Sequence, residues 1–215
     1  MADQPVLSVR NLDVTAHLPS GDVPVLSDVS FDLATGDVLG VIGESGAGMT
    51  VLSRAIVNWL PNPLAVTKGE ILFHGKNMST MSQEESRVLR GKEIAYIGSD
   101  PTTALDPTVP IGQHLVSKLM AVSPELSKAQ ARQRIFDLFD AVRIPSPKAR
   151  FNEFPFQFSG GMMQRVMIVD ALSADPTLLI ADNITQLLDV TIAKQIVRLL
   201  NGLRDDFDTS IIFVS

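Results

Sequence analysis

A glycine-rich stretch at residues 43–50, GESGAGMT, has the composition and spacing of a loop that binds phosphate. Gly43, Gly46 and Gly48 are expected to adopt backbone angles closed to other residues, so that successive N–H groups turn toward one anion. An apolar run before the loop predicts a buried strand, and apolar residues at helical spacing after it predict a helix. The positive end of that helix would also favour an anion. The candidate phosphate-binding residues are Gly43, Glu44, Ser45, Gly46, Ala47, Gly48, Met49 and Thr50.

One position of this loop departs from the P-loop pattern. The spacing G-x-x-x-x-G-x-T fits that pattern everywhere except at Met49, where a P-loop has lysine. The lysine normally brings a positive charge to the β- and γ-phosphates, and the residue after it, here Thr50, binds Mg²⁺. The sequence therefore predicts a phosphate-binding loop that lacks the usual lysine cation. The alternative interpretation is a strand-to-helix turn whose glycines serve close packing.

The composition is that of an ordinary globular chain. Of its 215 residues, 45% are apolar and 20% charged, and the net charge is -6. This acidic balance argues against duplex DNA or anionic lipid as the main partner. The absence of cysteine excludes disulfides, thiolate catalysis and cysteine-based metal sites in this segment. The sequence contains no leader pattern and no apolar run of membrane-spanning length, so we expect a cytoplasmic type of protein that reaches a membrane only through a partner.

Strands alternate with helices along the chain, which predicts an α/β fold with a largely parallel sheet. An antiparallel pair of strands, joined by a loop over 17–22, is expected at the start. Helices are expected over 111–143, with Pro124 as a start and a buried apolar stripe. The expected strands cover 6–14, 25–33, 38–42, 69–73, 93–97, 177–182 and 210–215, and the expected stripe is Ile135, Leu138, Phe139 and Val142. We expect three parts: a P-loop core over 1–110, a helical subdomain over 111–158, and a return to the core sheet over 159–215.

A second motif, FSGGMMQRV at residues 158–166, makes the prediction more specific. It follows the glycine loop and precedes the acid-ending strand LLIAD. In this order the three segments resemble the nucleotide-binding domains of ABC transporters, in particular those of oligopeptide and dipeptide importers. The resemblance covers nearly the whole chain and includes SDPTTALDP and LLDVTIAKQI. It implies a P-loop NTPase fold with a mostly parallel core sheet, an antiparallel β subdomain and a helical subdomain.

The resemblance implies ATP and Mg²⁺ as cofactors. Residues 43–50 would wrap the phosphates, Thr50 would ligate Mg²⁺, and Asp182 would hold the metal through water. The helices over 111–158 would meet a membrane permease at the cytoplasmic face of a bacterial cell membrane. A substrate-binding protein would act indirectly, and no nucleic acid is implied.

The same resemblance implies a second ABC ATPase domain, separate or fused, as a partner. The signature motif would touch the γ-phosphate bound to the P-loop of that partner. Asp189 would be the acid of the loop that crosses the dimer interface. The residues implied for the partner's site are Ser159, Gly160, Gly161 and Gln164.

Several departures from the family pattern fall on the chemistry of the site. Met49 replaces the lysine, Ser99 stands in place of a glutamine that reaches the metal and the attacking water, and Asn183 replaces the catalytic glutamate. An amide has no useful basicity, so Asn183 cannot act as a general base. In addition, Ile184 replaces a proline, and no adenine-stacking aromatic stands near Ala16 and His17. These changes predict weak binding of Mg-ATP and an impaired or inactive hydrolytic site beside an intact signature.

The hypothesis from sequence is therefore a degenerate nucleotide-binding subunit of a peptide importer, which completes a partner's ATP site. One alternative is an active ABC ATPase that energises peptide uptake with unusual catalytic residues. Another is a soluble ABC-type protein without a transport role, although the DNA-repair type would need a long coiled-coil insertion. The final strand, SIIFVS, ends where the family continues with its switch histidine, so we expect the polypeptide to be truncated there. The histidines present, His17, His74 and His114, do not stand at that place.

Overall fold

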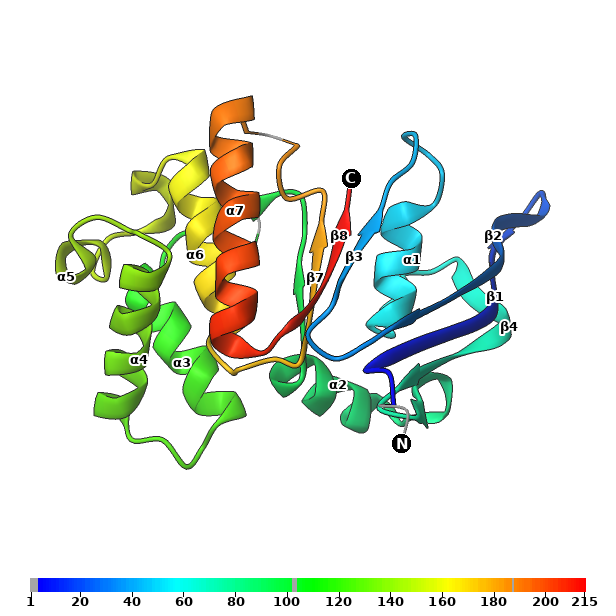
Figure 1. The fold of residues 1–215 in the computed structure, drawn as a ribbon, viewed down its shortest axis with the longest axis horizontal. Coiled ribbons are helices and arrows are strands. Elements are labelled where there is room, and N and C mark those ends of the chain that lie inside the picture. Colours follow the sequence, from blue (N-terminus) through cyan, green and yellow to red (C-terminus); the bar gives the residue numbers. More distant parts are fainter. Residues whose placement is uncertain (1–3, 102–103, 187) are drawn as a thin grey trace.

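The computed structural model describes residues 4–101, 104–186 and 188–215 of the chain (Figure 1). The strands are β1 (Leu7–Leu18), β2 (Gly21–Leu33), β3 (Val38–Val41), β4 (Leu64–Phe73), β5 (Lys76–Asn77), β6 (Ile94–Ile97), β7 (Leu178–Asp182) and β8 (Ser210–Val214). The α-helices are α1 (Met49–Ile56), α2 (Gln83–Lys92), α3 (Ile111–Val122), α4 (Lys128–Ala141), α5 (Pro147–Arg150), α6 (Gly160–Leu172) and α7 (Val190–Phe207). The described residues also include the short 3-10 helices η1 (Met78–Thr80) and η3 (Pro155–Gln157).

An antiparallel sheet with the strand order β2-β1-β4-β5 contains the N-terminal pair that the sequence predicts. The pair of β1 and β2 is longer than predicted. The expected loop over 17–22 shrinks to a tight turn at Pro19 and Ser20, because His17 pairs across the hairpin with Asp22. The His17 Nδ1 atom also lies 2.7 Å from an Asp22 carboxylate oxygen. Cross-strand pairing thus continues almost to the tip of the hairpin.

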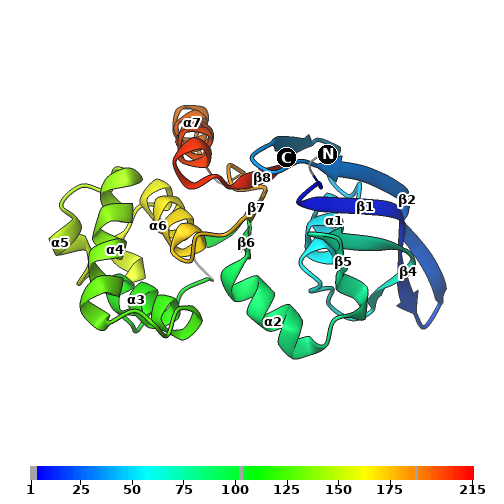
Figure 2. The same cartoon turned by 60° about the horizontal axis from the view of Figure 1, so that its bottom comes forward.

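A second sheet, with the order β3-β8-β7-β6, is parallel throughout. Every residue of β7 is buried, as expected for a strand covered on both faces. The carboxyl ends of parallel strands meet at one edge, where open α/β sheets bind their ligands. The loop after β3, the end of β7 and the segment after β6 therefore lie at the same edge of the sheet. In Figure 2 this sheet stands between the helices α3–α6 and the antiparallel sheet.

Helix α1, which follows the glycine loop, covers only part of the apolar stretch after it. The helix ends at Ile56, and Trp59 is 59% exposed beyond it. The residues that α1 buries are Leu52, Ser53, Ala55 and Ile56. The helix is therefore short, and its axis leads from the glycine loop into the core between the two sheets (Figure 1).

The stretch over 111–143 forms two helices, α3 and α4, and Pro124 does not begin the second. Ser127 is the N-cap of α4, and its hydroxyl accepts a hydrogen bond from the Gln130 backbone N–H. The Gln130 side chain in turn accepts from the Ser127 N–H at 2.9 Å, which completes a capping box. Capping favours a start at Lys128, four residues after the proline, which stays in the connecting turn.

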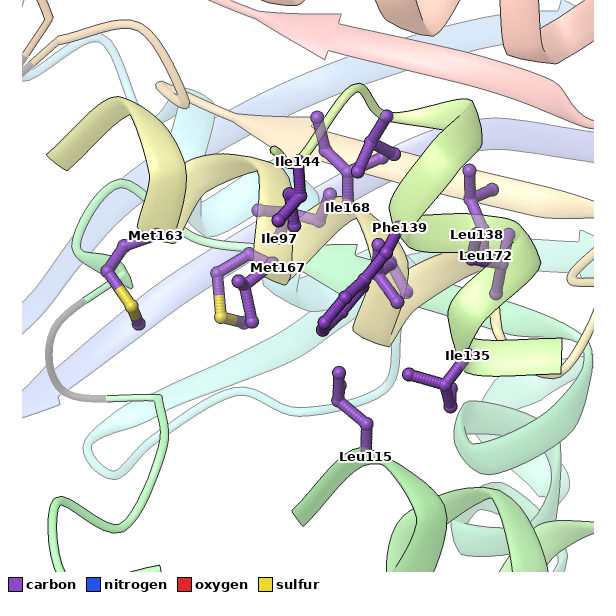
Figure 3. Close-up of a cluster of buried hydrophobic side chains, with 14 of the residues drawn as sticks. Ile97, Leu115, Ile135, Leu138, Phe139, Ile144, Met163, Met167, Ile168 and Leu172 are labelled. Atoms are coloured by element: carbon purple, nitrogen blue, oxygen red, sulfur yellow. The ribbon is translucent and has the colours of Figure 1, made fainter. Parts of the chain in front are cut away.

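The predicted stripe on α4 is core, as expected. Ile135, Leu138, Phe139 and Val142 are each 2% exposed or less. In Figure 3 the Phe139 side chain points toward Met167 on α6, in the same buried cluster as Ile135 and Leu138. The same cluster includes residues of β6 and β7, so the helical part and the parallel sheet share one core. No helix among the described residues combines the length and the apolar character needed to cross a bilayer.

Candidate functional site

A cavity of about 600 Å³ opens at the carboxyl edge of the parallel sheet. It brings together the glycine loop, Ser99 after β6, and Asn183 after β7. The lining residues are Val25, Gly43, Ser45, Gly46, Gly48, Met49, Thr50, Val51, Ser99, Asn183, Thr185, Gln186 and Ser215. Met49, Ser99 and Asn183, the positions that the sequence analysis singled out, thus line the same cavity.

The glycine loop has two residues in the left-handed region. Gly46 has φ of 90° and Gly48 has φ of 86°. A side chain at Gly48 would also lie 2.8 Å from Leu26 Cδ2, so only glycine fits there. Gly48 directly precedes α1, whose first N–H groups have no partner within the helix and face the loop. The loop is therefore shaped to receive an anion.

Gly43 does not need a left-handed angle, so that prediction was wrong for this glycine. Its role is close packing, because a Cβ atom there would lie 3.1 Å from the Met49 sulfur. The thioether of Met49 thus lies close to Gly43, at the start of the loop. Among the described residues that line the cavity, none is lysine or arginine. The part of the cavity wall formed by the glycine loop therefore offers an anion backbone N–H groups and no side-chain cation.

Asp182, at the end of β7, is 2% exposed and accepts three side-chain hydrogen bonds. The Thr50 hydroxyl donates to Oδ1 at 3.2 Å, and the Asn183 amide donates to the same oxygen at 3.1 Å. The Tyr96 hydroxyl donates to Oδ2 at 2.7 Å. A buried carboxylate needs such partners to remain charged. The sequence placed Thr50 and Asp182 at one site, and the structure brings them into contact.

Thr50 and Asp182 fit a magnesium ion. Their oxygens are 3.2 Å apart, near the roughly 2.9 Å between adjacent ligands of an octahedral Mg²⁺. A hydroxyl and one carboxylate are typical protein ligands for Mg²⁺, which takes its other oxygens from water and phosphate. Within the described residues, no group of three or more His, Cys, Asp or Glu could hold a metal ion alone. A metal here would therefore depend on the oxygens of a bound phosphate compound.

Asn183 follows Asp182 in a left-handed conformation, with φ of 53°. Its backbone N–H donates to the Val214 carbonyl at 2.9 Å, which ties it to β8. Asparagine tolerates this conformation better than most residues do. Its amide group is engaged with Asp182 and carries no base. The cavity therefore contains no carboxylate at the place where the resemblance implies one.

Tyr96 has an unusual acidity because of this arrangement. Burial and the hydrogen bond to Asp182 raise the pKa of Tyr96 to about 12, although Arg54 acts in the opposite direction. The ordinary value is about 10. The protonated phenol therefore contributes stability that is complete below about pH 10 and is lost as the pH rises toward about 12.

We expect the single tyrosine of this chain to ionise late. Absorbance titration of the folded chain should give a midpoint well above pH 10, and titration in denaturant should give one near 10. Circular dichroism at each pH would establish that the chain is still folded. A midpoint near 10 in the folded chain would contradict the hydrogen bond to Asp182.

The signature residues lie apart from this cavity. Ser159 is the N-cap of α6, and its Oγ accepts from the Met162 N–H at 3.4 Å. Ser159 and Gly160 are exposed, and neither lines the cavity in the described part of the chain. Gly161 packs closely, since a Cβ there would lie 3.0 Å from Ile192 on α7. The exposed end of α6 is therefore available to another molecule.

Two residues that the sequence assigned to interfaces also have structural roles. Gln164 is 1% exposed, so its side chain does not reach the surface with the other signature residues. Asp189 is exposed and caps α7, where its carboxylate accepts from the Thr191 and Ile192 N–H groups at 2.9 and 3.0 Å. Capping at this end of a helix is worth about 1 kcal/mol. The sequence analysis did not predict Tyr96 as a residue of the site. A tyrosine within an apolar strand could have indicated it, because a buried tyrosine hydroxyl usually has a hydrogen-bond partner.

The site can be compared with known proteins. A profile described as ABC transporter matches residues 26–186. The chain belongs to the ABC transporter family. The family prediction is thus confirmed, and the matched region of this ABC transporter family member runs from β2 past the end of β7.

Among its relatives are ATP-binding proteins of peptide transport. This family member is 41% identical over its whole length to the dipeptide transport ATP-binding protein DppD of Lactococcus lactis subsp. cremoris, of which it covers 62%. It is 43% identical over 98% of its length to the oligopeptide transport ATP-binding protein OppD of Bacillus subtilis, of which it covers 59%. The chain thus spans about three fifths of the length of these curated relatives.

Solved structures support the fold. The dimeric structure of MJ0796, described as a bacterial ABC transporter cassette, has a TM-score of 0.82 and 21% identity, with 97% of this chain and 87% of that chain covered. CbiO1 from Clostridium perfringens gives the same TM-score at 23% identity, with 98% and 78% covered. The predicted fold, a parallel core sheet with an antiparallel β subdomain and helices, is therefore confirmed.

Proposed function

We propose that this ABC transporter family member is the nucleotide-binding subunit of a peptide importer and that its own ATP site is catalytically degenerate. The names of its relatives support the transport of dipeptides or oligopeptides. The loop over 43–50, with Thr50 and Asp182 in contact, supports the binding of a nucleotide with Mg²⁺. When bound, Mg²⁺ would neutralise part of the phosphate charge. The protein would work at the cytoplasmic face of a bacterial membrane, with permease subunits and, indirectly, a substrate-binding protein.

The observation that carries the degenerate assignment is Met49 in the wall of the cavity. Its uncharged side chain occupies the place from which a lysine would reach the phosphates. A hydrogen bond to a charged group contributes about 1.5–3 kcal/mol, or roughly 10- to 100-fold in affinity. Asn183 offers no base, and Ser99 is too short to replace a glutamine side chain. The positioning of the attacking water, the positive charge at the phosphates and the transfer of a proton would thus all be weakened.

A partner domain would supply the working site. The exposed N-terminus of α6, with Ser159 and Gly160, lies outside the cavity of its own chain. Backbone N–H groups at a helix start and a serine hydroxyl are suited to a phosphate. We therefore assign this end of α6 to the ATP site of a second ABC ATPase domain, separate or fused. The result would be an assembly with one active site.

An active ATPase with unusual catalytic residues is the second candidate. The observation in its favour is that Thr50 and Asp182 keep the geometry of a metal site. Turnover measured on this protein alone separates the two candidates. Measurable hydrolysis that depends on Thr50 and Asp182 would favour the active enzyme.

Weak binding of Mg-ATP is the direct test of the degenerate site. Without the lysine charge and an adenine-stacking aromatic, affinity should be lower by on the order of 100-fold than in a complete site. In calorimetry, Met49→Lys should tighten binding by about 10- to 100-fold. Met49→Leu, which keeps an apolar side chain, is the control and should change little. Low-micromolar binding by the unaltered protein would contradict the proposal.

A further inference from the structure

The carboxylate of Asp182 is held at both of its oxygens, and the shortest hydrogen bond comes from outside the glycine loop. Thr50 and Asn183 donate to Oδ1, whereas the Tyr96 hydroxyl donates to Oδ2 at 2.7 Å. Asp182 belongs to β7 and Tyr96 to the neighbouring strand β6, where it pairs with Ile180. The backbone pairing of these two neighbouring strands therefore sets the distance between the phenol and the carboxylate.

Close neighbours confine the Tyr96 ring. The ring of Trp59 meets it edge to face, with centroids 6.5 Å apart and an angle of 84° between the planes. Gly98 lies beside the ring, since a Cβ atom there would be 3.5 Å from Tyr96 Cε1. A ring packed in this way keeps its hydroxyl in one direction. Its oxygen thus acts as a fixed donor toward Asp182.

We propose that Tyr96 is a positioning residue for magnesium at this site. By holding Oδ2 of Asp182, it keeps Oδ1 beside Thr50, where a metal would be shared with a nucleotide. This inference rests on the proposed function, and it adds that the metal side of the site is maintained although its hydrolytic groups are lost. The site would then hold a magnesium nucleotide without turning it over.

The test compares nucleotide affinity with and without the metal in the full-length protein. ATP binding is measured by calorimetry in EDTA and in saturating Mg²⁺, and the ratio of the two dissociation constants gives the magnesium enhancement. Tyr96→Phe keeps the ring against Trp59 and removes only the hydroxyl. Loss of a hydrogen bond to a metal-holding carboxylate typically costs 10- to 100-fold in metal affinity. We expect the enhancement to fall by about 10-fold or more, with binding in EDTA unchanged within about twofold.

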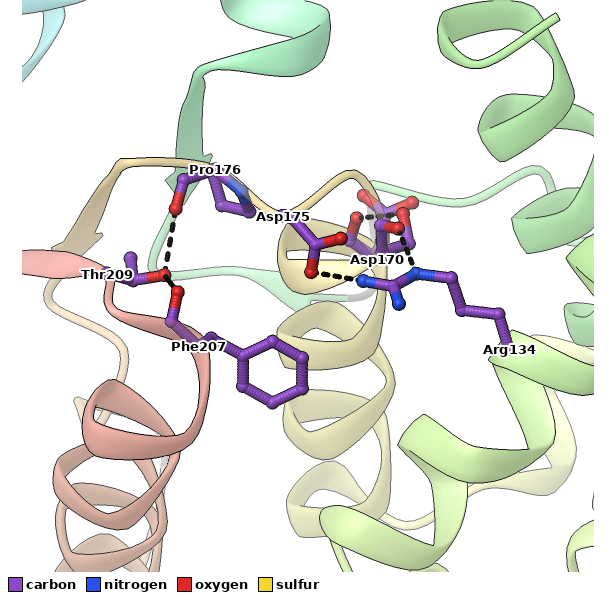
Figure 4. Close-up of polar contacts among 7 residues, drawn as sticks. Arg134, Asp170, Asp175, Pro176, Phe207 and Thr209 are labelled. Atoms are coloured by element: carbon purple, nitrogen blue, oxygen red, sulfur yellow. Dashed lines mark hydrogen bonds and ion pairs between the residues drawn. The ribbon is translucent and has the colours of Figure 1, made fainter. Parts of the chain in front are cut away.

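A matched control removes a buried hydroxyl elsewhere. Thr209 is 1% exposed, and its hydroxyl donates to the Pro176 carbonyl at 2.8 Å (Figure 4). Thr209→Val should leave the magnesium enhancement unchanged. The inference would be overturned if Tyr96→Phe shows the same magnesium enhancement as the unaltered protein. It would also be overturned if Tyr96→Phe weakens ATP binding by the same factor in EDTA and in Mg²⁺. If the unaltered protein binds ATP without any magnesium enhancement, the inference alone fails. If it binds no ATP under either condition, the proposed function fails with it.

Discussion

Ser159→Arg will abolish ATP turnover and transport by the assembled transporter, although this residue lies outside its own chain's cavity. Ser159 is exposed at the start of α6, and a bulky cation there would prevent a partner's phosphates from approaching the helix. Preorganised donors of this kind each contribute about 10²- to 10³-fold to turnover. Gly160→Asp should act similarly, because a carboxylate facing phosphate in a dehydrated interface is strongly repelled. We expect a loss of about 100-fold or more in either variant.

The loss of a helix cap is the competing explanation, and Ser127 controls for it. Ser127 is also an exposed serine N-cap, on α4, so Ser127→Arg loses a cap of the same kind. Each change should cost about 1 kcal/mol of stability. Only Ser159→Arg should stop turnover of the purified complex. Asn183→Ala should do little, since this amide has no catalytic role to lose. If Ser159→Arg turns over normally and Asn183→Ala does not, the two ATP sites have been assigned the wrong way round.

Asn183→Glu by itself will not restore hydrolysis to the degenerate site. A base has little to act on while Met49 and Ser99 leave the phosphates and the water unplaced, and residues that act as a unit are strongly non-additive. The structure adds two costs. Position 183 has φ of 53°, which glutamate tolerates less well than asparagine. The new carboxylate would also replace an amide that donates to buried Asp182, so two negative charges would meet.

The measurement uses the assembled complex with the partner's own site disabled. Asn183→Glu should give turnover at the background level, and Asn183→Gln serves as the uncharged control of the same length. Combining Asn183→Glu with Met49→Lys and Ser99→Gln should raise turnover above background by about 100-fold or more, the lower end of what a general base contributes. Robust hydrolysis by Asn183→Glu alone would show that Met49 and Ser99 are not the missing contacts.

Short-range patterns in the sequence were sufficient to predict the glycine loop and the class of fold. Turn-forming glycines, a buried apolar run and a helical repeat act over a few residues, so they can be recognised without knowing the tertiary structure. This is why the position of the glycine loop before α1 and the strand that ends in Asp182 were predicted correctly. The departures at Met49 and Asn183 were equally visible, since each is a change of residue type within such a pattern.

The partners of these residues were decided by the tertiary structure. Thr50 meets Asp182 across 132 positions of sequence, and Tyr96 meets it across 86. No local repeat encodes such a meeting, because it depends on which strands are neighbours in the sheet and on their register. For the same reason the sequence did not place Gln164 in the core. The residue types at the nucleotide site were thus determined by sequence alone. The hydrogen bonds that hold Asp182 exist only because β6, β7 and α1 pack together.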